Sequence, residues 1–376
     1  MSVLILSQYG DVHAEAVHWA LNERGIPVRR WTVSDFPARQ RVTASLSSNR
    51  ELQLEILDDA RSGALVDGRL RDPSAVWNRR LGKPSLHAEL DPDYAPFVRE
   101  ECRRFIQSVP HIVAPDAKWI NEPAAARLYE GKLPQLMQAR RAGLAIPDTI
   151  VTNDPEKVRA LCDRYGAIIY KAFLVPSWNF GDEAGRKLAV TFTTKLTRET
   201  LDQHLPSVSF APGIFQPLIP KKSELRVVVL GGRLIAARLD SQSASDTAID
   251  WRAGESRFAI EKVRLPEHVE KGILQFMKAC GLCFGCIDLI ETPSGSHVFL
   301  EVNQMGQFLW LDEANDELDT FQEFCSFLSS AAGLPTVPEE FPDYRDYRAS
   351  TSFEQFAQVL DPEELYYQNQ QTYVLA

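Results

Sequence analysis

The chain lacks an excess of positive charge. Its 376 residues include 41 lysines and arginines against 51 aspartates and glutamates, which gives a formal net charge of −10. Proteins that bind nucleic acid without sequence preference need a cationic surface, because displacing counterions from the phosphates drives that binding. We therefore expect no nucleic-acid partner, although a local basic patch is compatible with this total.

Long hydrophobic runs are absent as well. No apolar stretch comes near the roughly 20 residues of a membrane-spanning helix. The apolar start, residues 1–7, has no basic leader and is too short for a signal peptide, so we interpret it as a first strand. With 44% hydrophobic and 24% charged residues, the composition is that of a globular protein. These features predict a soluble, cytoplasmic protein without a membrane partner.

The cysteines do not indicate a disulfide framework. Six cysteines in a chain of this length, without a secretion signal, suit a reducing compartment. Cys280, Cys283 and Cys286 have the spacing CxxCxxC, which can ligate zinc or an iron–sulfur cluster. Cys280 lies at an expected helix end, however, and Cys283 and Cys286 fall on opposite faces of the strand that follows. We interpret all three as structural.

The order of expected elements divides the chain into four segments. Residues 1–115 begin strand, helix, strand, which opens an α/β layer, but they carry no glycine-rich phosphate-binding fingerprint. Residues 116–214 form a second unit that starts with helices, and residues 215–334 form a third unit rich in strands. The acidic, tyrosine-rich tail, residues 335–376, has no assigned role. A dimer arm, a docking segment and partial disorder all remain open for it.

Two segments between strands carry signals of irregular structure. Residues 215–220 contain two prolines, which should prevent a regular central strand and leave a linker with free backbone groups. Residues 174–188 form a polar, glycine-containing loop between apolar strands, a composition typical of a mobile lid.

Two arginines end an expected strand. Arg79 and Arg80 stand at the end of the strand 75–80, in the motif VWNRRLGKP. Contact with an anionic substrate and an ordinary pair of surface arginines both fit this position, and the second interpretation is the simpler one.

Oxygen-bearing side chains interrupt the apolar pattern of residues 284–313. This stretch predicts two strands around a Pro-Ser-Gly-Ser turn. In the second strand, Glu301 and Asn303 share one face, whereas Leu300 and Val302 share the other. We expect the apolar face to pack on the core and the oxygen-bearing face to line a site.

The pairing of the two strands decides whether a third oxygen ligand joins this face. If Glu291 pairs with Val298, Asp288 falls opposite Glu301, whereas a one-residue slip would turn the aspartate towards the apolar layer. Carboxylates crowded with an amide oxygen need a compensating cation. Mg²⁺ takes hard oxygen ligands, so Asp288, Glu301 and Asn303 form a predicted Mg²⁺ site. The alternative is a solvated strand with ordinary exposed acids.

Cationic side chains appear at unusual places in the middle of the chain. Lys132 stands just before a helix, and Lys171 lies inside a buried strand, where a lysine is rare unless it faces an anion or extends its amine to solvent. Arg226 and Arg238 lie on strands that flank a Gly-Gly hairpin, and Arg252 follows them. Several arginines returning to one sheet indicate a polyanionic ligand, with surface ion pairs as the alternative.

This order of residues resembles the ATP-grasp ligases. The shared pattern is a lysine before a helix, a lysine in a strand, the linker FQPLI, an ExR strand, a further arginine, and an aspartate before ExN; it extends to about residue 333. More narrowly, the motifs VWNRR, WINEP, GLAIPDT, IDWR and FLEVNQMGQFLWLDE resemble the microviridin-type, or graspetide, peptide maturases. The fold class that this implies is α/β (α+β), an ATP-grasp fold with an N-terminal α/β pre-ATP-grasp domain.

The resemblance also implies a role for each candidate residue. These roles are ATP-phosphate contacts for Lys132 and Lys171, adenine contacts for Gln216, Leu218 and Ile219, a ribose contact for Glu224, phosphate or acyl-phosphate contacts for Arg226 and Arg252, and Mg²⁺ ligation for Asp288, Glu301 and Asn303.

The implied activity is that of an ATP-dependent ligase, with ATP and Mg²⁺ as cofactors and a ribosomally synthesised precursor peptide as partner. Such an enzyme converts an Asp or Glu side chain of the peptide into an acyl-phosphate, which a Ser or Thr hydroxyl or a Lys amine attacks to close a ring. Two alternatives remain: a ligase that adds an amino acid to a peptide or protein terminus, and a non-catalytic nucleotide-binding module that recognises a peptide. The precursor, the type of linkage and the formation of a homodimer stay open.

Overall fold

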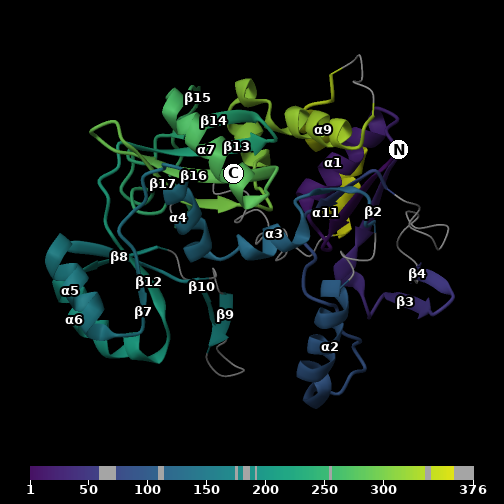
Figure 1. Ribbon diagram of the computed structural model, residues 1–376, viewed down its shortest axis with the longest axis horizontal. Helices are drawn as coiled ribbons and strands as arrows, with labels where there is room; N and C mark the ends of the chain where they lie inside the picture. Colours follow the sequence, from purple (N-terminus) through teal and green to yellow (C-terminus); the bar gives the residue numbers. More distant parts are fainter. Residues whose placement is uncertain are drawn as a thin grey trace.

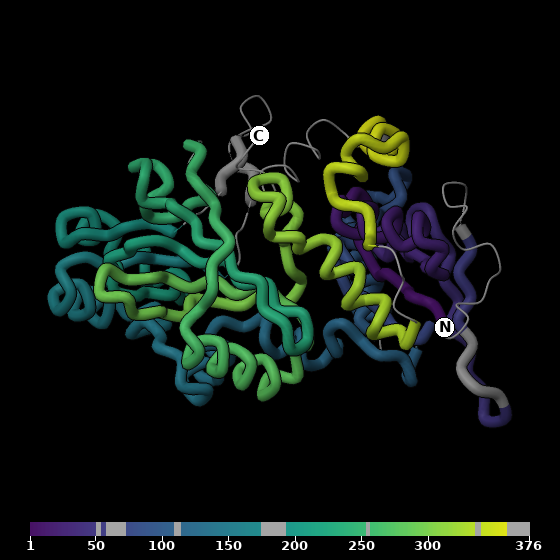
Figure 2. The backbone as a smooth tube through the Cα atoms, turned by 90° about the horizontal axis from the view of Figure 1, so that it is seen from above, coloured from purple at the N-terminus to yellow at the C-terminus, as the bar shows by residue number. Residues whose placement is uncertain are grey.

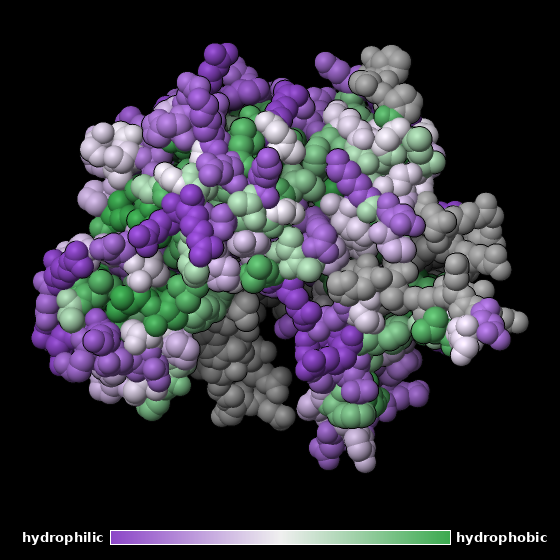
Figure 3. Space-filling view, viewed as in Figure 1, coloured by the Kyte–Doolittle hydropathy of each residue, from purple (hydrophilic) through white to green (hydrophobic). Residues whose placement is uncertain are grey.

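The computed structural model describes residues 1–58, 73–108, 114–173, 177–180, 187–190, 193–253, 256–334 and 340–359. An N-terminal domain lies on the right of Figure 1, a central subdomain at the lower left and a C-terminal subdomain at the upper left. The face in Figure 3 carries both hydrophilic and hydrophobic patches, with strongly hydrophilic side chains around α2 (Ala95–Ser108). Within the described ranges, no helix combines the length and apolarity that crossing a membrane requires.

The N-terminal domain is built on a four-stranded parallel sheet with the strand order β2–β1–β5–β6. Its elements are β1 (Val3–Ser7), α1 (Val12–Glu23), β2 (Val28–Thr32), the hairpin β3 (Gln40–Ser47) and β4 (Arg50–Asp58), β5 (Ala75–Asn78), α2 and β6 (Lys118–Ile120). The chain passes from β1 to β2 on one side, and later to β5 on the other side of β1. The direction of winding therefore reverses between β1 and β5.

The central subdomain is a small antiparallel sheet with the order β11–β8–β12–β7, covered by two helices. Its elements are β7 (Ile150–Thr152), α5 (Pro155–Tyr165), β8 (Ala167–Lys171), β11 (Thr194–Thr197), α6 (Arg198–His204) and β12 (Gly213–Pro217). Strand β12 pairs with β8 on one side and β7 on the other. The expectation that residues 215–220 cannot join a central strand is thus wrong for residues 215–217; Pro217 is the last residue of the strand.

The lid predicted at residues 174–188 falls partly outside the described residues. Its described parts, β9 (Ser177–Phe180) and part of β10 (Lys187–Val190), belong to an antiparallel pair of strands. The lid itself stays a prediction.

The C-terminal subdomain is a five-stranded antiparallel sheet with the order β15–β14–β13–β16–β17. Its elements are β13 (Ser223–Leu230), β14 (Arg233–Leu239), β15 (Ile260–Val263), α7 (Glu267–Cys280), β16 (Phe284–Glu291), β17 (His297–Asn303), α8 (Leu309–Ala314) and α9 (Thr320–Ala331). Helices α7 and α4 (Lys132–Arg141) cover one face, on which Val227, Ile287 and Phe299 are fully buried. Helix α3 (Pro123–Leu128) leads into α4.

The opposite face of this sheet changes from apolar to polar along the strands. Val228 and Cys286 belong to a core that also contains Val3 and Trp77 of the N-terminal sheet. One core therefore joins the N-terminal domain to the C-terminal subdomain, whereas the central subdomain has a core of its own around Val158 and Phe215. Beyond Val228 and Cys286, the same face carries Arg226 and Asp288, which are paired neighbours on β13 and β16.

The β16–β17 register places Asp288 opposite Glu301, as predicted, but by a different route. Glu291 pairs with His297 rather than Val298, so the expected pairing next to the turn is off by one residue. The register then shifts between Asp288 and Leu289, where Leu300 is an extra residue in β17. This β-bulge restores the carboxylate pair. It also moves Leu300 into the lining of the site, away from the apolar face where it was expected.

The predicted structural role of the three clustered cysteines agrees with their positions. Cys280 belongs to the core beneath α7, whereas Cys286 belongs to the core on the other face of the sheet. The Sγ of Cys283 is 3.7 Å from the carbonyl oxygen of Trp119. The three thiols thus do not converge on one point.

The described part of the tail packs on the N-terminal domain. It consists of α10 (Tyr344–Arg348) and α11 (Thr351–Val359), which contact α1, and Tyr344 and Tyr347 are each 1% exposed. Figure 2 shows these helices over α1. Residues 335–339 and 360–376 lie outside the described part, so the roles considered for them remain untested.

Candidate active site

Two adjacent cavities with shared lining residues lie where the central and C-terminal subdomains meet. The smaller has a volume of about 50 Å³ and the larger about 560 Å³. The residues that line both are Lys171, Thr193, Gln216, Arg252, Leu300 and Glu301. Of the residues predicted for the site, Leu218, Ile219, Glu224 and Asp288 line the smaller cavity, and Lys132 and Asn303 line the larger one. Arg226 lies directly behind this lining and bonds Asp288.

Each of the two predicted metal-binding carboxylates is paired with a cation. Arg226 Nη1 donates to Asp288 Oδ1 at 2.7 Å, and its Nη2 donates to the carbonyl oxygen of Gln307 at 2.9 Å. Lys132 forms an ion pair with Glu301. Burial alone would raise the pKa of Glu301, but Lys132 and other nearby cations lower it to about 2. Burial raises the pKa of Asp288, and Arg226 opposes that rise.

The donor set fits Mg²⁺ in chemical type. Two carboxylates face each other on adjacent strands, and an amide oxygen follows on the same face, all of them hard oxygen donors. Asn303 Oδ1 accepts bonds from the backbone N–H groups of Met305 and Gly306, each at 3.2 Å. In the described residues, no three His, Cys, Asp or Glu side chains form a metal-binding group. A third protein ligand would therefore have to come from Asn303, with water or phosphate oxygens completing the shell.

Lys171 faces the cavities, which agrees with the prediction that it faces a site for an anion rather than extending its amine to solvent. It ends β8, lines both cavities, and has a pKa lowered by burial, with Glu301 acting in the opposite sense. A buried amine near a cavity is stabilised by an anionic ligand.

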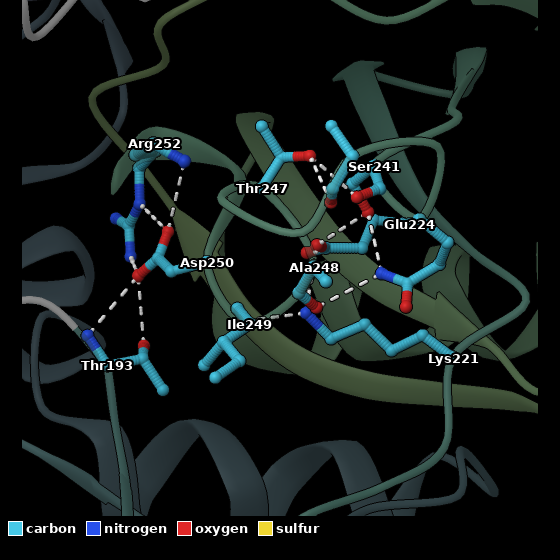
Figure 4. Close-up of polar contacts among 11 residues, drawn as sticks. Thr193, Lys221, Glu224, Ser241, Thr247, Ala248, Ile249, Asp250 and Arg252 are labelled. Carbon is cyan, nitrogen blue, oxygen red and sulfur yellow. Dashed lines mark hydrogen bonds and ion pairs between the residues drawn. The ribbon is translucent and has the colours of Figure 1, made fainter. Parts of the chain in front are cut away.

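Arg252 is held in place by a neighbouring aspartate that the sequence did not single out (Figure 4). Its Nε and Nη2 each donate to Asp250 at 2.8 Å, a bidentate pair. Thr193, from the segment that leads into β11, donates its hydroxyl to Asp250 Oδ2 at 2.9 Å. Despite burial, Arg252 lowers the pKa of Asp250, and Asp250 raises that of Arg252. Asp250 therefore links Arg252 to the central subdomain.

Glu224 belongs to a second polar network in the same loop region (Figure 4). Lys221 Nζ donates to Glu224 Oε1 at 2.9 Å and to the carbonyl oxygen of Ile249 at 2.7 Å. Ser241 donates to the same carboxylate oxygen at 3.0 Å. Burial raises the pKa of Glu224, and Lys221 opposes this. Lys221 was not predicted, although its place after the linker and before the acid was a usable signal.

The end of the smaller cavity that is lined by the linker, residues 215–220, offers hydrogen-bonding groups between apolar walls. Gln216 Nε2 donates to Thr149 Oγ1 at 2.9 Å, whereas its buried Oε1 has no hydrogen-bond partner among the described residues. Ile249, Trp251 and Ile290 supply apolar wall. The backbone N–H of Leu218 is bonded to Ala167 at 3.1 Å, so the predicted free backbone is wrong at that group.

Arg238 and Arg79 lie outside this cluster. Arg238 bonds Glu291 at 3.2 Å and Glu261 at 3.7 Å, so it does not join the predicted polyanion site. Arg79 is 1% exposed, which corrects its interpretation as a surface residue.

Comparison with known proteins accounts for this arrangement. The family model described as "MvdD pre-ATP grasp domain" matches residues 2–127. The macrocyclase MdnC of Microcystis aeruginosa, solved with the precursor peptide MdnA, is 29% identical to this chain with a TM-score of 0.76; the match covers 88% of this chain and 100% of that chain. The chain has the ATP-grasp fold of this macrocyclase. The predicted fold, with its N-terminal pre-ATP-grasp domain, is confirmed.

Two further solved structures share this ATP-grasp fold. A RiPP-associated ATP-grasp ligase of Chryseobacterium gregarium, solved with ADP and a leader and core peptide, has a TM-score of 0.75 at 24% identity and covers 91% of this chain and 100% of that chain. The ligase PsnB, solved with a minimal precursor, Mg and ADP, has a TM-score of 0.66 at 22% identity. The match covers 88% of this chain and 98% of that chain.

One curated relative is a glutamate ligase. The tetrahydromethanopterin:alpha-L-glutamate ligase of Methanocaldococcus jannaschii is 23% identical over 177 residues. The match spans 45% of this chain and 56% of that ligase.

Proposed function

We propose that this ATP-grasp protein uses ATP to activate Asp or Glu side chains of a ribosomally made precursor peptide and links them to Ser or Thr hydroxyls or Lys amines, which forms ester or amide macrocycles. The observation that carries the proposal is the pair of adjacent cavities that share Lys171, Arg252 and Glu301 in their linings. The lining of the smaller cavity carries groups suited to the base and sugar of ATP, and the larger cavity leaves room for a peptide side chain beside the phosphates.

We assign the smaller cavity to the nucleotide because of its hydrogen-bonding groups and its apolar walls. Apolar side chains hold a flat base between them, and Gln216 Oε1 is a buried acceptor suited to an amino group. Glu224 is placed for a sugar hydroxyl, since a carboxylate accepts such bonds well. Lys132 and Lys171 supply positive charge to the phosphates, and Arg252 presents a guanidinium held in a fixed direction by Asp250.

The residues favour phosphoryl transfer by positioning and by neutralising charge. A carboxylate oxygen of the peptide attacks the γ-phosphorus, ADP leaves, and an acyl-phosphate forms. A hydroxyl or amine then attacks the acyl carbon, and phosphate leaves while the nucleophile loses its proton. Mg²⁺ held by Asp288, Glu301 and Asn303 would neutralise phosphate charge in this site. Arg252, which lines both cavities, stabilises the negative charge that moves between the reacting groups, and Arg226 acts from behind the lining through its bond to Asp288.

The test uses purified protein, Mg²⁺ and ATP, with the short acidic peptides encoded beside this protein. We expect ADP release that depends on peptide, and products that are lighter than the substrate by one water per link. The absence of both with every such peptide would contradict the proposal. A cytoplasmic location belongs to the same proposal, because ATP and newly made peptide are available there.

A second candidate is a ligase that adds an amino acid to a peptide or protein terminus. The similarity to the glutamate ligase favours it. The two candidates change the mass in opposite directions, since addition makes the acceptor heavier and cyclisation makes it lighter. A heavier product after incubation with free glutamate would decide for the second.

A further inference from the structure

The larger cavity has a second wall that belongs to the N-terminal domain. Gln8 follows β1, and Arg80, Leu81 and Gly82 come shortly after β5; all four line the cavity together with Lys132 and Asn303 of the ATP-grasp part. Strands β1 and β5 are parallel neighbours, so their carboxyl ends meet at one edge of the sheet. The winding of the sheet reverses between these two strands, and α/β sheets bind ligands outside the carboxyl ends of the strands at such a reversal.

The two loops at this edge are packed closely together. Gly82 has φ = +73°, and a Cβ atom there would lie 2.7 Å from the Cβ of Gln8 and 3.0 Å from that of Ser34. Only glycine accommodates both the conformation and the contact. The loop that carries Arg80 is therefore held against the loop that carries Gln8.

Arg79 fixes the other side of the Arg80 backbone. It forms a buried ion pair with Asp11 at 3.2 Å and donates to the carbonyl oxygens of Met305, at 2.6 Å, and Gly306. Met305 lies on the loop after Asn303 and itself lines the larger cavity. Arg80 is thus carried by a backbone that is tied to the loop next to the candidate metal ligands.

Arg80 is half-buried and lines the larger cavity, whereas Lys171 and Arg252 line both cavities. A cation in that position lies away from the base-binding end and beside the space left for the peptide. A guanidinium in a partly buried wall favours a carboxylate, with which it can form two parallel hydrogen bonds.

We propose that Arg80, on the wall that it forms with Gln8 and Gly82, binds a carboxylate of the substrate peptide, so that the N-terminal domain contributes a carboxylate subsite opposite the nucleotide. This inference rests on the proposed function for the identity of the peptide as substrate, but the subsite itself is a binding property.

The test measures binding without turnover. The probes are a synthetic peptide with one Glu flanked by Ser and Thr, and its Gln counterpart, each titrated into the full-length protein with Mg²⁺ and ADP. We expect wild type to bind the Glu peptide more tightly than the Gln peptide. Arg80→Gln should lower the affinity for the Glu peptide by about tenfold or more and leave the affinity for the Gln peptide unchanged. Arg80→Lys should retain part of the preference.

Arg238→Gln is the matched control, because Arg238 is also an arginine bonded to the protein but lies outside both cavities. It should leave the Glu preference unchanged. ADP affinity, measured separately, should be the same in wild type and Arg80→Gln. If Arg80→Gln lost as much affinity for ADP as for the Glu peptide, Arg80 would be assigned to the nucleotide instead. A wild type without a Glu preference would overturn the proposal, and so would a Glu preference that persists in Arg80→Gln.

The outcomes separate this subsite from the proposed function. A Glu preference that depends on Arg80, in a protein that gives no water loss with any peptide, supports the subsite and contradicts macrocyclisation. Water loss that continues with an unchanged KM for peptide in Arg80→Gln supports macrocyclisation and contradicts the subsite.

Discussion

Asp288 and Glu301 face each other across β16 and β17, yet each carboxylate is bonded by a different cation. Arg226 holds Asp288 from the neighbouring strand, and Lys132 reaches Glu301 from the start of α4. The pairs compensate two half-buried negative charges that would otherwise repel each other. In the proposed mechanism, these carboxylates exchange their lysine and arginine contacts for a metal ion and phosphates.

Replacing Glu301 tests the metal assignment. We expect Glu301→Ala to lower peptide-dependent ADP formation by about 10²- to 10³-fold, because a charge-stabilising contact of the reaction is lost. The variant should keep the circular dichroism spectrum of wild type. Glu267→Ala on the exposed face of α7 is the control and should retain full turnover. Near wild-type activity of Glu301→Ala at low Mg²⁺ concentration would remove this residue from the metal site.

Replacing Asp250 tests the placement of Arg252. Asp250→Asn keeps the size of the side chain but loses the negative charge and one of the two oxygens that accept the bidentate pair from Arg252. We expect the kcat for peptide-dependent ADP release to fall by about tenfold or more, because the guanidinium loses its fixed direction. Thr193→Val removes only the hydroxyl bond to Asp250, while the backbone N–H of residue 193 keeps its own bond to Asp250 at 3.4 Å, so this variant should cost less. Equal kcat values for Asp250→Asn and wild type would show that Arg252 needs no such support.

Much of the site was predictable because its chemistry is local in the sequence. Glu301 and Asn303 lie two residues apart on one strand, and Lys171 interrupts an apolar strand, so alternation alone reveals them. The position of Asp288 was also predicted, but the reason was incomplete. The bulge at Leu300 carries no mark in the sequence, since leucine is common in regular strands as well.

Contacts between distant segments were not predictable. The buried state of Arg79 depends on Asp11 and on carbonyl oxygens of Met305 and Gly306, which lie 226 and 227 residues away in the chain. An isolated sequence motif gives no sign of such partners. The same holds for Asp250, whose role becomes visible only when Thr193 of the central subdomain lies beside it.

The buried pair of Arg79 and Asp11 should be important for stability. Burial acts to raise the pKa of Asp11, and Arg79 is the main group that lowers it, to about 2 in wild type, so Arg79→Met leaves a buried carboxyl group without the cation that compensates its charge. Breaking a buried pair from one side costs about 3–5 kcal/mol of the free energy of unfolding. Urea unfolding at neutral pH measures this loss. The double variant Asp11→Asn with Arg79→Met should recover part of it; a single variant as stable as wild type would contradict the assignment.

Asp312 should make stability depend on pH in the sense opposite to most carboxylates. It lies at the start of α8, bonded by the hydroxyl of Thr320 and, at 3.3 Å, by the backbone N–H of Phe321. Burial raises its pKa from 3.8 to about 7, although these bonds act against the rise. Between these two pH values the folded protein holds a proton that the unfolded chain releases, so this contribution to stability is present in full below 3.8 and is lost as pH rises through about 7.

The difference between wild type and Asp312→Asn isolates this term. The neutral amide keeps the shape of the protonated acid, so the free energy of unfolding of wild type relative to the variant should fall between about pH 4 and pH 7. The fall is at most on the order of 4 kcal/mol, because each pKa unit corresponds to 1.36 kcal/mol. Other titrating groups cancel in the difference. A difference that stays constant across this range would show that Asp312 is ionised in the folded protein at the lower pH.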